Sequence, residues 1–181
     1  QQTAKVYRRA VALLELDLRM PSLFKQLHIT PGIGISDYLV ATDKVSIEDI
    51  LRPHESVPGL FIASSGSLPP NPAELMSSDN LAQLINKLKA SFDYIIIDTA
   101  PVGKVADAFS LSPHVDSTIY IVRYNYTSKG QLELIEEIYA TKKFAHPMIV
   151  LNDAKEETPH AYGYGYNYGY KKSEKQEVSI S

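Results

Sequence analysis

The chain has 181 residues, 44% of them hydrophobic, and carries a formal net charge of −3. This length fits one domain that buries about two-thirds of its unfolded surface, and the weak charge excludes a basic footprint for nucleic acid or for an anionic membrane surface. The sequence has no cysteine, which excludes disulfides and thiolate metal sites, and no apolar run approaches the roughly 20 residues of a transmembrane helix.

Apolar runs and helical spacing predict alternating strands and helices along the chain. Several of the runs do not alternate with polar residues, which is typical of strands covered on both faces in a parallel sheet. The pattern predicts a doubly wound α/β domain with a mostly parallel sheet. In chain order, the expected elements are a strand over 11–14, helices over 36–39 and 47–51, a strand over 60–63, a helix over 73–90, strands over 94–97 and 118–122, a helix over 130–143 and a strand over 148–151.

The periodic pattern stops near residue 155, so we expect a folded domain over 1–155 and a flexible tail over 156–181. In the tail, tyrosines alternate with small residues in the run AYGYGYNYGY. The interleaved glycines disfavour a helix and offer no side chains for a core, so the phenols should be accessible to solvent. Composition alone leaves open a low-complexity linker. The five tyrosines are Tyr162, Tyr164, Tyr166, Tyr168 and Tyr170.

Acidic residues follow the predicted strands. Ligands of an open parallel sheet bind beyond the carboxyl ends of its strands, and here these ends carry Glu15, Asp17, Asp98 and Asn152 with Asp153. An apolar strand followed directly by Asp is the pattern of a carboxylate that holds Mg²⁺. One such Asp could simply cap the next turn. Several carboxylates meeting at one edge would repel each other, so we expect a cation or a phosphate-bound metal there.

Three segments resemble motifs of the bacterial tyrosine kinases, which form the cytoplasmic domains of polysaccharide co-polymerases. LLELDLRMP, residues 13–21, resembles their second acidic motif, called Walker A′, and YIIIDTAPV, residues 94–102, resembles their Walker B motif. GSLPPNPAELMSS, residues 66–78, is similar to their Pro-Asn-Pro-Ala-Glu-Leu segment. That segment is the most specific of the three, because deviant Walker ATPases of the partitioning kind usually lack it. The tyrosine-rich tail is a further hallmark of the family.

The resemblance implies roles for five residues. Asp17 would assist deprotonation of the attacking phenol or orient Mg²⁺, and Asp98 would be the Walker B metal ligand. Glu15 occupies the first acidic position, where Asp is commoner, and its longer side chain changes its reach. Arg19 would contact phosphate or an acidic neighbour, with a surface ion pair as the alternative. Asn152 closes a strand where related ATPases place an adenine-contacting amide.

The proline-rich segment has two interpretations. Pro72 followed by Ala-Glu-Leu is typical of the first turn of a helix. The resemblance instead implies a loop near a subunit contact or the nucleotide.

The family's phosphate-binding loop, GxxxxGK[ST], does not occur in the sequence. Such a loop cradles the phosphates with backbone N–H groups, and its lysine reaches the β and γ groups. The segment at residues 32–34 has the pattern Gly-Ile-Gly but follows no convincing strand and has no lysine partner. Residues 1–155 would therefore be a partial nucleotide-binding kinase domain. We expect truncation rather than degeneration, because the acidic motifs keep their chemistry.

The resemblance implies a protein-tyrosine kinase that transfers the γ-phosphate of ATP, with Mg²⁺, to the tail tyrosines and so regulates capsule or exopolysaccharide export. It implies as partners the neighbouring subunits of a homo-oligomeric ring, a membrane-spanning segment upstream or on another chain, and a tyrosine phosphatase. The implied location is the cytoplasmic face of the bacterial inner membrane. Two alternatives stay open: a partitioning-type ATPase that phosphorylates no protein, and a scaffold module without catalysis.

Overall fold

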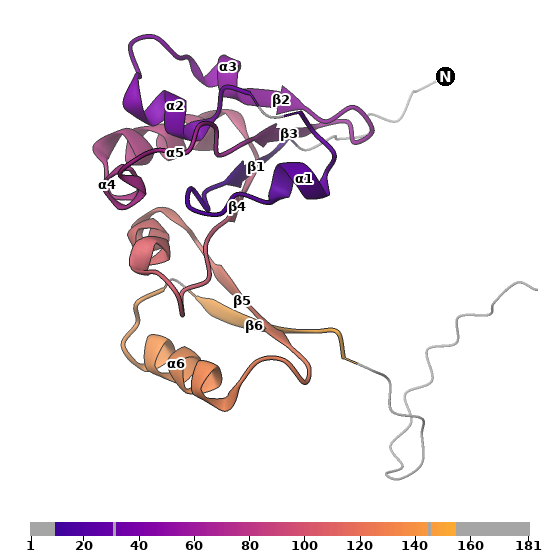
Figure 1. Cartoon of the computed structure of the whole chain (residues 1–181), viewed down its shortest axis with the longest axis vertical. Helices are drawn as coiled ribbons and strands as arrows, with labels where there is room; N and C mark the ends of the chain where they lie inside the picture. The colour runs from indigo at the N-terminus through magenta and orange to yellow at the C-terminus, as the bar shows by residue number, and fades with distance from the viewer. Residues whose placement is uncertain (1–9, 31, 145, 155–181) are drawn as a thin grey trace, which may run out of the picture.

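The structure is a computed structural model that describes residues 10–30, 32–144 and 146–154. Its strands form a four-stranded sheet in the order β2-β3-β1-β4 and a two-stranded sheet of β5 and β6. Figure 1 shows the larger sheet in the upper half of the molecule and the smaller sheet, with helix α6 (Lys129–Ala140), in the lower half. The strands are β1 (Val11–Glu15), β2 (Leu51–Pro53), β3 (Leu60–Ala63), β4 (Tyr94–Asp98), β5 (Thr118–Arg123) and β6 (Pro147–Asn152).

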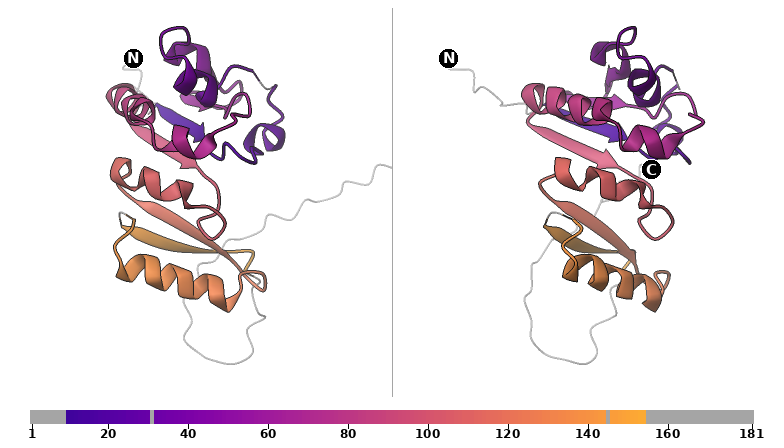
Figure 2. Two further views of the ribbon diagram at one scale, coloured as in Figure 1. Left: turned by 60° about the vertical axis from the view of Figure 1, so that its left-hand side comes forward. Right: turned by 90° about the vertical axis from the view of Figure 1, so that its left-hand side faces the viewer.

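Most of the strand pairing is parallel, as the sequence predicts. β1 lies between β3 and β4, with Leu14 level with Ala63 on one side and with Ile97 on the other. β5 and β6 are also parallel, whereas β2 runs antiparallel to β3. Figure 2 shows that β5 points in the same direction as β4. Because parallel neighbours end at the same edge, the residues that follow β1, β3 and β4 lie together.

Serine side chains begin the two long helices. Ser78 Oγ accepts a hydrogen bond from the Leu81 N–H in α5 (Asp79–Ser91), and Ser128 Oγ accepts one from the Gln131 N–H in α6. These caps satisfy N–H groups that a first helical turn leaves without partners. The shorter helical segments are α1 (Leu23–Gln26), α2 (Ile35–Val40), α3 (Ile47–Ile50), α4 (Pro72–Met76) and the 3₁₀ segment η1 (Ala106–His114).

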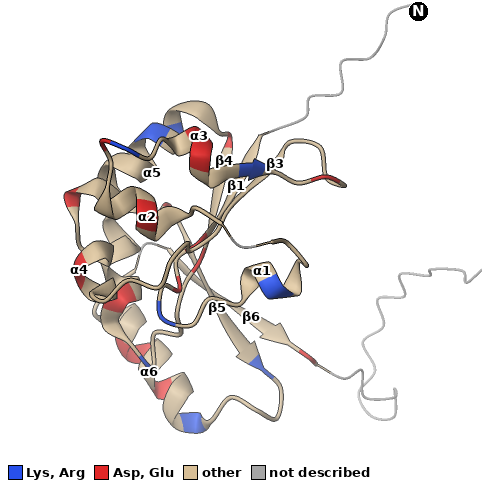
Figure 3. Cartoon of the chain, turned by 45° about the horizontal axis from the view of Figure 1, so that its top comes forward, with Lys and Arg blue, Asp and Glu red and all other residues tan. Residues whose placement is uncertain are grey.

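The helices lie on both sides of the strands. Figure 3 shows α2 to α6 on one side and the short α1 on the other, which confirms a doubly wound α/β arrangement. No helix in the described part of the chain is long and apolar enough to cross a membrane.

The single helix predicted over 73–90 is in fact two helices. α4 has Pro72 in its first turn, which agrees with the structural interpretation of that proline. Ser78 Oγ donates a hydrogen bond to the Leu75 carbonyl at 2.7 Å while it also caps α5. One hydroxyl thus ends α4 and begins α5, and this breaks the helix that apolar spacing alone predicts.

β4 and β5 are not covered on both faces, contrary to the prediction from their unbroken apolar runs. In β4, Ile95 and Ile97 pack against the core, whereas Ile96 is 54% exposed. In β5, Ile119 and Ile121 are 60% and 62% exposed. Within the described residues, one face of each strand is therefore open to solvent.

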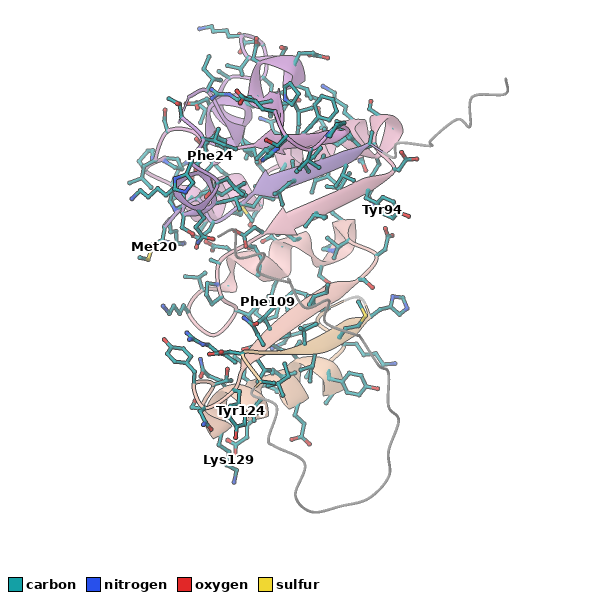
Figure 4. All side chains as sticks on the ribbon, turned by 90° about the vertical axis from the view of Figure 1, so that its right-hand side faces the viewer. Met20, Phe24, Tyr94, Phe109, Tyr124 and Lys129 are labelled. Atoms are coloured by element: carbon teal, nitrogen blue, oxygen red, sulfur yellow. The ribbon has the colours of Figure 1, made fainter. Side chains whose placement is uncertain are left out.

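Two groups of buried side chains hold the fold together. The larger group is built on β1 and the helices α2, α4 and α5. The smaller group comprises Ala108, Ile138 and Phe144. η1 contributes to both, because Leu111 belongs to the larger group, while Phe109 stacks on Phe144 with ring centroids 5.0 Å apart. Figure 4 shows Phe109 between the levels of β4 and β5, so η1 packs against both halves of the molecule.

Candidate functional site

The carboxyl ends of β1 and β4 bring three predicted acidic residues to one edge of the sheet. Glu15 and Asp98 are register partners on these adjacent strands, and Asp17 lies two residues beyond Glu15. Figure 4 shows Met20, in the loop after Asp17, at this edge, and Tyr94 at the opposite end of β4. The convergence expected from the sequence is therefore present.

The Glu15 carboxylate is buried and holds two neighbouring loops in place. The Glu15 side chain is 1% exposed. Oε1 accepts a hydrogen bond from the Leu23 N–H at 2.6 Å, and Oε2 accepts one from the Ser65 N–H at 3.2 Å. Leu23 begins α1 and Ser65 lies just beyond β3, so this carboxylate ties two loops to the end of β1. Both oxygens of Glu15 thus accept backbone N–H groups. A bound ligand would therefore contact Asp17 and Asp98 rather than Glu15.

Asp17 and Asp98 keep carboxylate oxygens available. Asp17 Oδ1 accepts hydrogen bonds from the N–H groups of Arg19 and Met20, at 3.2 and 3.0 Å. Its Oδ2 and the Asp98 carboxylate accept none from the described residues. Partial burial raises the pKa of Asp98, and the negative charges of Glu15 and Asp17 raise it further. A cation at this edge would offset the repulsion.

Two buried hydroxyl groups near the carboxylates have no hydrogen-bond partner among the described residues. They belong to Ser64, which follows β3 and is 4% exposed, and to Thr99, which follows Asp98. Neither residue is among the site residues predicted from the sequence. Mg²⁺ prefers hard oxygen ligands and is commonly held by one or two carboxylates together with substrate phosphates. Asp17 and Asp98 offer the two carboxylates of such a set, and the described residues contain no cluster of three or more acidic, His or Cys side chains that could hold a metal.

Arg19 binds an acidic neighbour on η1. Its Nε lies 2.7 Å from Asp107 Oδ2, and its Nη2 lies 3.3 Å from Asp107 Oδ1. The hydrogen bond that Arg19 donates to the Asp107 carboxylate raises the pKa of Arg19. Of the two contacts expected for Arg19, the structure contains the acidic neighbour. Asp107 is 88 residues away in sequence and belongs to no motif, so the sequence offers no signal for the pair.

The other predicted site residues do not join this cluster. Asn152 ends β6 in the two-stranded sheet, where it is level with Arg123 and its Oδ1 accepts a hydrogen bond from the Asp153 N–H. The tail tyrosines from Tyr162 to Tyr170, and the predicted boundary between domain and tail, lie outside the described residues.

A close crossing of two loops borders the site and was not predicted. A Cβ atom on Gly34, which precedes α2, would lie 2.4 Å from the backbone N of Gly66, which follows β3 with φ at +82°. Asp37 accepts hydrogen bonds from the N–H groups of Gly34 and Ser67 at 2.9 and 3.2 Å. Burial alone would raise the pKa of Asp37, but these hydrogen bonds lower it below its usual value. The lack of a side chain at Gly34 therefore allows the two loops to pack closely against each other.

Comparison with known sequences finds tyrosine kinases, although no family model matches the chain. The chain is 35% identical over 126 residues to the tyrosine-protein kinase ptk of Acinetobacter johnsonii, covering 70% of this chain and 17% of that protein. It is 31% identical over 155 residues to the tyrosine-protein kinase YwqD of Bacillus subtilis, covering 86% of this chain and 64% of that protein. The chain thus spans less than two thirds of the length of either relative.

Solved structures share the fold. The kinase domain of the Escherichia coli tyrosine kinase ETK aligns with a TM-score of 0.74 at 26% identity, covering 88% of this chain and 62% of that one. The septum site-determining protein MinD of Pyrococcus horikoshii, complexed with Mg-ADP, aligns with a TM-score of 0.59 at 22% identity, covering 80% of this chain and 58% of that one. The second likeness shows the fold alone.

Proposed function

This chain belongs to the bacterial tyrosine kinases, and we propose that it carries the metal-binding acids and the acceptor tyrosines of a tyrosine autokinase. The observation that carries this function is the meeting of Asp17 and Asp98 at the carboxyl edge of a parallel sheet. Both keep oxygens free of hydrogen bonds from the described residues, and the pKa of Asp98 is raised by nearby negative charge. That donor set suits Mg²⁺ bound together with nucleotide phosphates.

In the proposed reaction, a tail phenol attacks the γ-phosphorus of ATP in line with the bond to the leaving ADP. The new phenolic O–P bond forms while the bond between the γ-phosphorus and the bridging oxygen breaks, and the phenolic proton passes to water, assisted by the negative charge of Asp17. Mg²⁺ would be held by Asp98 and Asp17 and would supply charge neutralisation for the phosphates. The reaction also needs a phosphate-binding loop, which would come from outside these 181 residues.

The acceptors in this scheme are Tyr162, Tyr164, Tyr166, Tyr168 and Tyr170, presented by a neighbouring subunit of a ring. Each phosphotyrosine adds about −1.5 to −2 of charge, so five add roughly −8 to −10 to a tail that is otherwise close to neutral. Such tails would repel one another and the acidic edge, which would loosen the ring. A phosphatase would reverse the change. The same proposal locates the enzyme at the cytoplasmic face of the inner membrane, with a membrane-spanning partner segment, in capsule or exopolysaccharide export.

The test uses protein made from the complete gene, incubated with Mg-ATP and examined by mass spectrometry. Wild-type protein should gain phosphate on the tail tyrosines, and a variant with Phe at all five positions should lose nearly all of it. D98N should lower incorporation by about 100-fold or more, because the Mg²⁺ that neutralises the phosphates loses a carboxylate ligand. The matched control is Y139F, which removes a hydroxyl from a tyrosine of α6 that is 69% exposed.

Two results would overturn the function. ATP hydrolysis without phosphotyrosine would assign the chain to the partitioning-type ATPases. Absence of ATP binding by calorimetry, in protein that carries a phosphate-binding loop, would leave a scaffold module instead.

A further inference from the structure

The pair formed by Arg19 and Asp107 lies beside the acidic edge and joins elements far apart in the sequence. Two hydrogen bonds, at 2.7 and 3.3 Å, connect the Arg19 guanidinium to the two carboxylate oxygens of Asp107. The Asp107 side chain is 12% exposed and that of Arg19 is 40% exposed. A bidentate pair of this kind is more strongly oriented than a single contact between exposed charges.

Arg19 has a second carboxylate close by. Asp17 is two residues earlier in the same loop, and its negative charge acts on the Arg19 guanidinium alongside that of Asp107. Asp17 Oδ1 already accepts the N–H groups of Arg19 and Met20, but its Oδ2 makes no hydrogen bond within the described residues. A guanidinium released from Asp107 would therefore find a free carboxylate oxygen in its own loop.

Packing on both sides holds the segment η1, which carries Asp107, in place. The residue after it, Ala108, is buried in the smaller core, and Leu111 of the same segment is buried in the larger one. Ser110 Oγ lies 3.2 Å from Ser77 Oγ at the end of α4. With η1 held on both sides, Asp107 offers Arg19 a partner whose position does not depend on the loop after β1.

We propose that Asp107 is a positioning residue that holds the Arg19 guanidinium away from Asp17, so that the Asp17 carboxylate stays free for a divalent cation. This role rests on the proposed metal site. An arginine paired with Asp17 would occupy its free oxygen and place a positive charge where the cation must bind. Asp107 thus protects cation binding without touching the ion.

The test measures Mn²⁺ binding to the 181-residue chain by electron paramagnetic resonance, in wild type, D107N, R19Q and the double variant. D107N should weaken Mn²⁺ binding by about three- to tenfold, the range expected for one partly screened charge pair. R19Q should bind at least as tightly as wild type, because no guanidinium remains to compete. The double variant should recover wild-type affinity to within about twofold.

The matched control is D153N. It also removes one carboxylate charge from an Arg–Asp pair, since Arg123 Nη2 lies 3.1 Å from Asp153 Oδ2 at the end of the two-stranded sheet. D153N should leave Mn²⁺ affinity unchanged. Urea unfolding of every variant checks that the fold is intact, and amide hydrogen exchange at Arg19 and Met20 reports the loop directly.

The outcomes separate this inference from the proposed function. If wild type binds Mn²⁺ and D107N binds it equally well, Asp107 has no such role. Equal weakening in D107N, R19Q and the double variant would show that the pair only braces the loop. If wild type binds no Mn²⁺, even as protein from the complete gene with ADP present, and D98N behaves identically, the metal site of the proposed function is itself wrong.

Discussion

Glu15 and Asp98 are level with each other on adjacent strands, yet their carboxylates have opposite surroundings. Glu15 is 1% exposed and accepts two backbone N–H groups, whereas Asp98 is only partly shielded from solvent and its carboxylate accepts none from the described residues. Glu15 therefore holds the loops together, whereas Asp17 and Asp98 keep the carboxylate oxygens that the proposed metal site requires.

Replacement of Glu15 should destabilise the fold rather than only impair chemistry. E15A leaves the N–H groups of Leu23 and Ser65 without their acceptor, which should lower the free energy of unfolding by about 2–5 kcal/mol. E15Q keeps one acceptor oxygen and should lose less. Urea denaturation gives the values, with E55A at an exposed glutamate as control. A loss for E15A as small as that of E55A would refute the bracing role.

The raised pKa of Asp98 gives a pH dependence of defined sign. The folded state binds its proton more tightly than the unfolded state does, so the contribution of Asp98 to stability is present at low pH and is lost as pH rises through its folded pKa. D98N removes that loss. At pH 7 without divalent ions it should be more stable than wild type, by less than about 1 kcal/mol because solvent screens this carboxylate.

Thermal unfolding of D98N and wild type from pH 3 to pH 7 checks this sign. The difference should shrink as pH falls towards about 3.9, the usual pKa of Asp. Added Mg²⁺ should stabilise wild type more than D98N. A D98N variant that is less stable than wild type at pH 7 would contradict the expectation.

Gly34 should tolerate no side chain. A Cβ there would lie 2.4 Å from the backbone N of Gly66 and 2.5 Å from the Ser64 carbonyl oxygen, and neither backbone atom can move aside cheaply. We expect G34A to lower the free energy of unfolding by about 1–3 kcal/mol. G130A is the matched control, because its Cβ in α6 would meet no atom within 4 Å apart from its own neighbours in the helix; it should stabilise by about 0.5–1 kcal/mol.

The open apolar strands should make the 181-residue chain self-associate. Ile96, Ile119 and Ile121 are exposed on β4 and β5, and such strands pair readily with other chains. I121K should lower the apparent mass seen by sedimentation at high protein concentration. V40K, at an equally exposed apolar residue of α2, should not. Identical sedimentation of I121K and wild type would exclude this surface as the cause.

The strands and the acidic edge could be predicted from the sequence because their signals are local. The β3 run over 60–63 matches the structure residue for residue, and the acids after 11–14 and 94–97 meet because parallel strands end at one edge. The helix break at Ser77 and Ser78 was missed because serine is read as a weak helix former rather than as a cap shared by two helices.

The rest depends on contacts between segments far apart. Asp107 is 88 residues from Arg19, and the bracing of Glu15 needs Ser65, 50 residues away. An unbroken apolar run predicts a strand correctly, but it gives no information on which layers cover the strand. This is why the exposure of Ile96 and Ile121 was not foreseen.

The smaller core has a consequence for the way in which the proposed acceptor tyrosines are attached to the domain. Few apolar side chains support the half formed by α6, β5 and β6, and local opening requires least free energy where buried apolar contacts are fewest. Native-state hydrogen exchange should therefore show β6 opening well before β1. Because the chain continues from β6 towards residues 155–181, the proposed acceptor segment would be attached to the half with the fewest buried apolar contacts. Local opening of β6 would then let the tyrosines reach farther than they could from a rigid point of attachment.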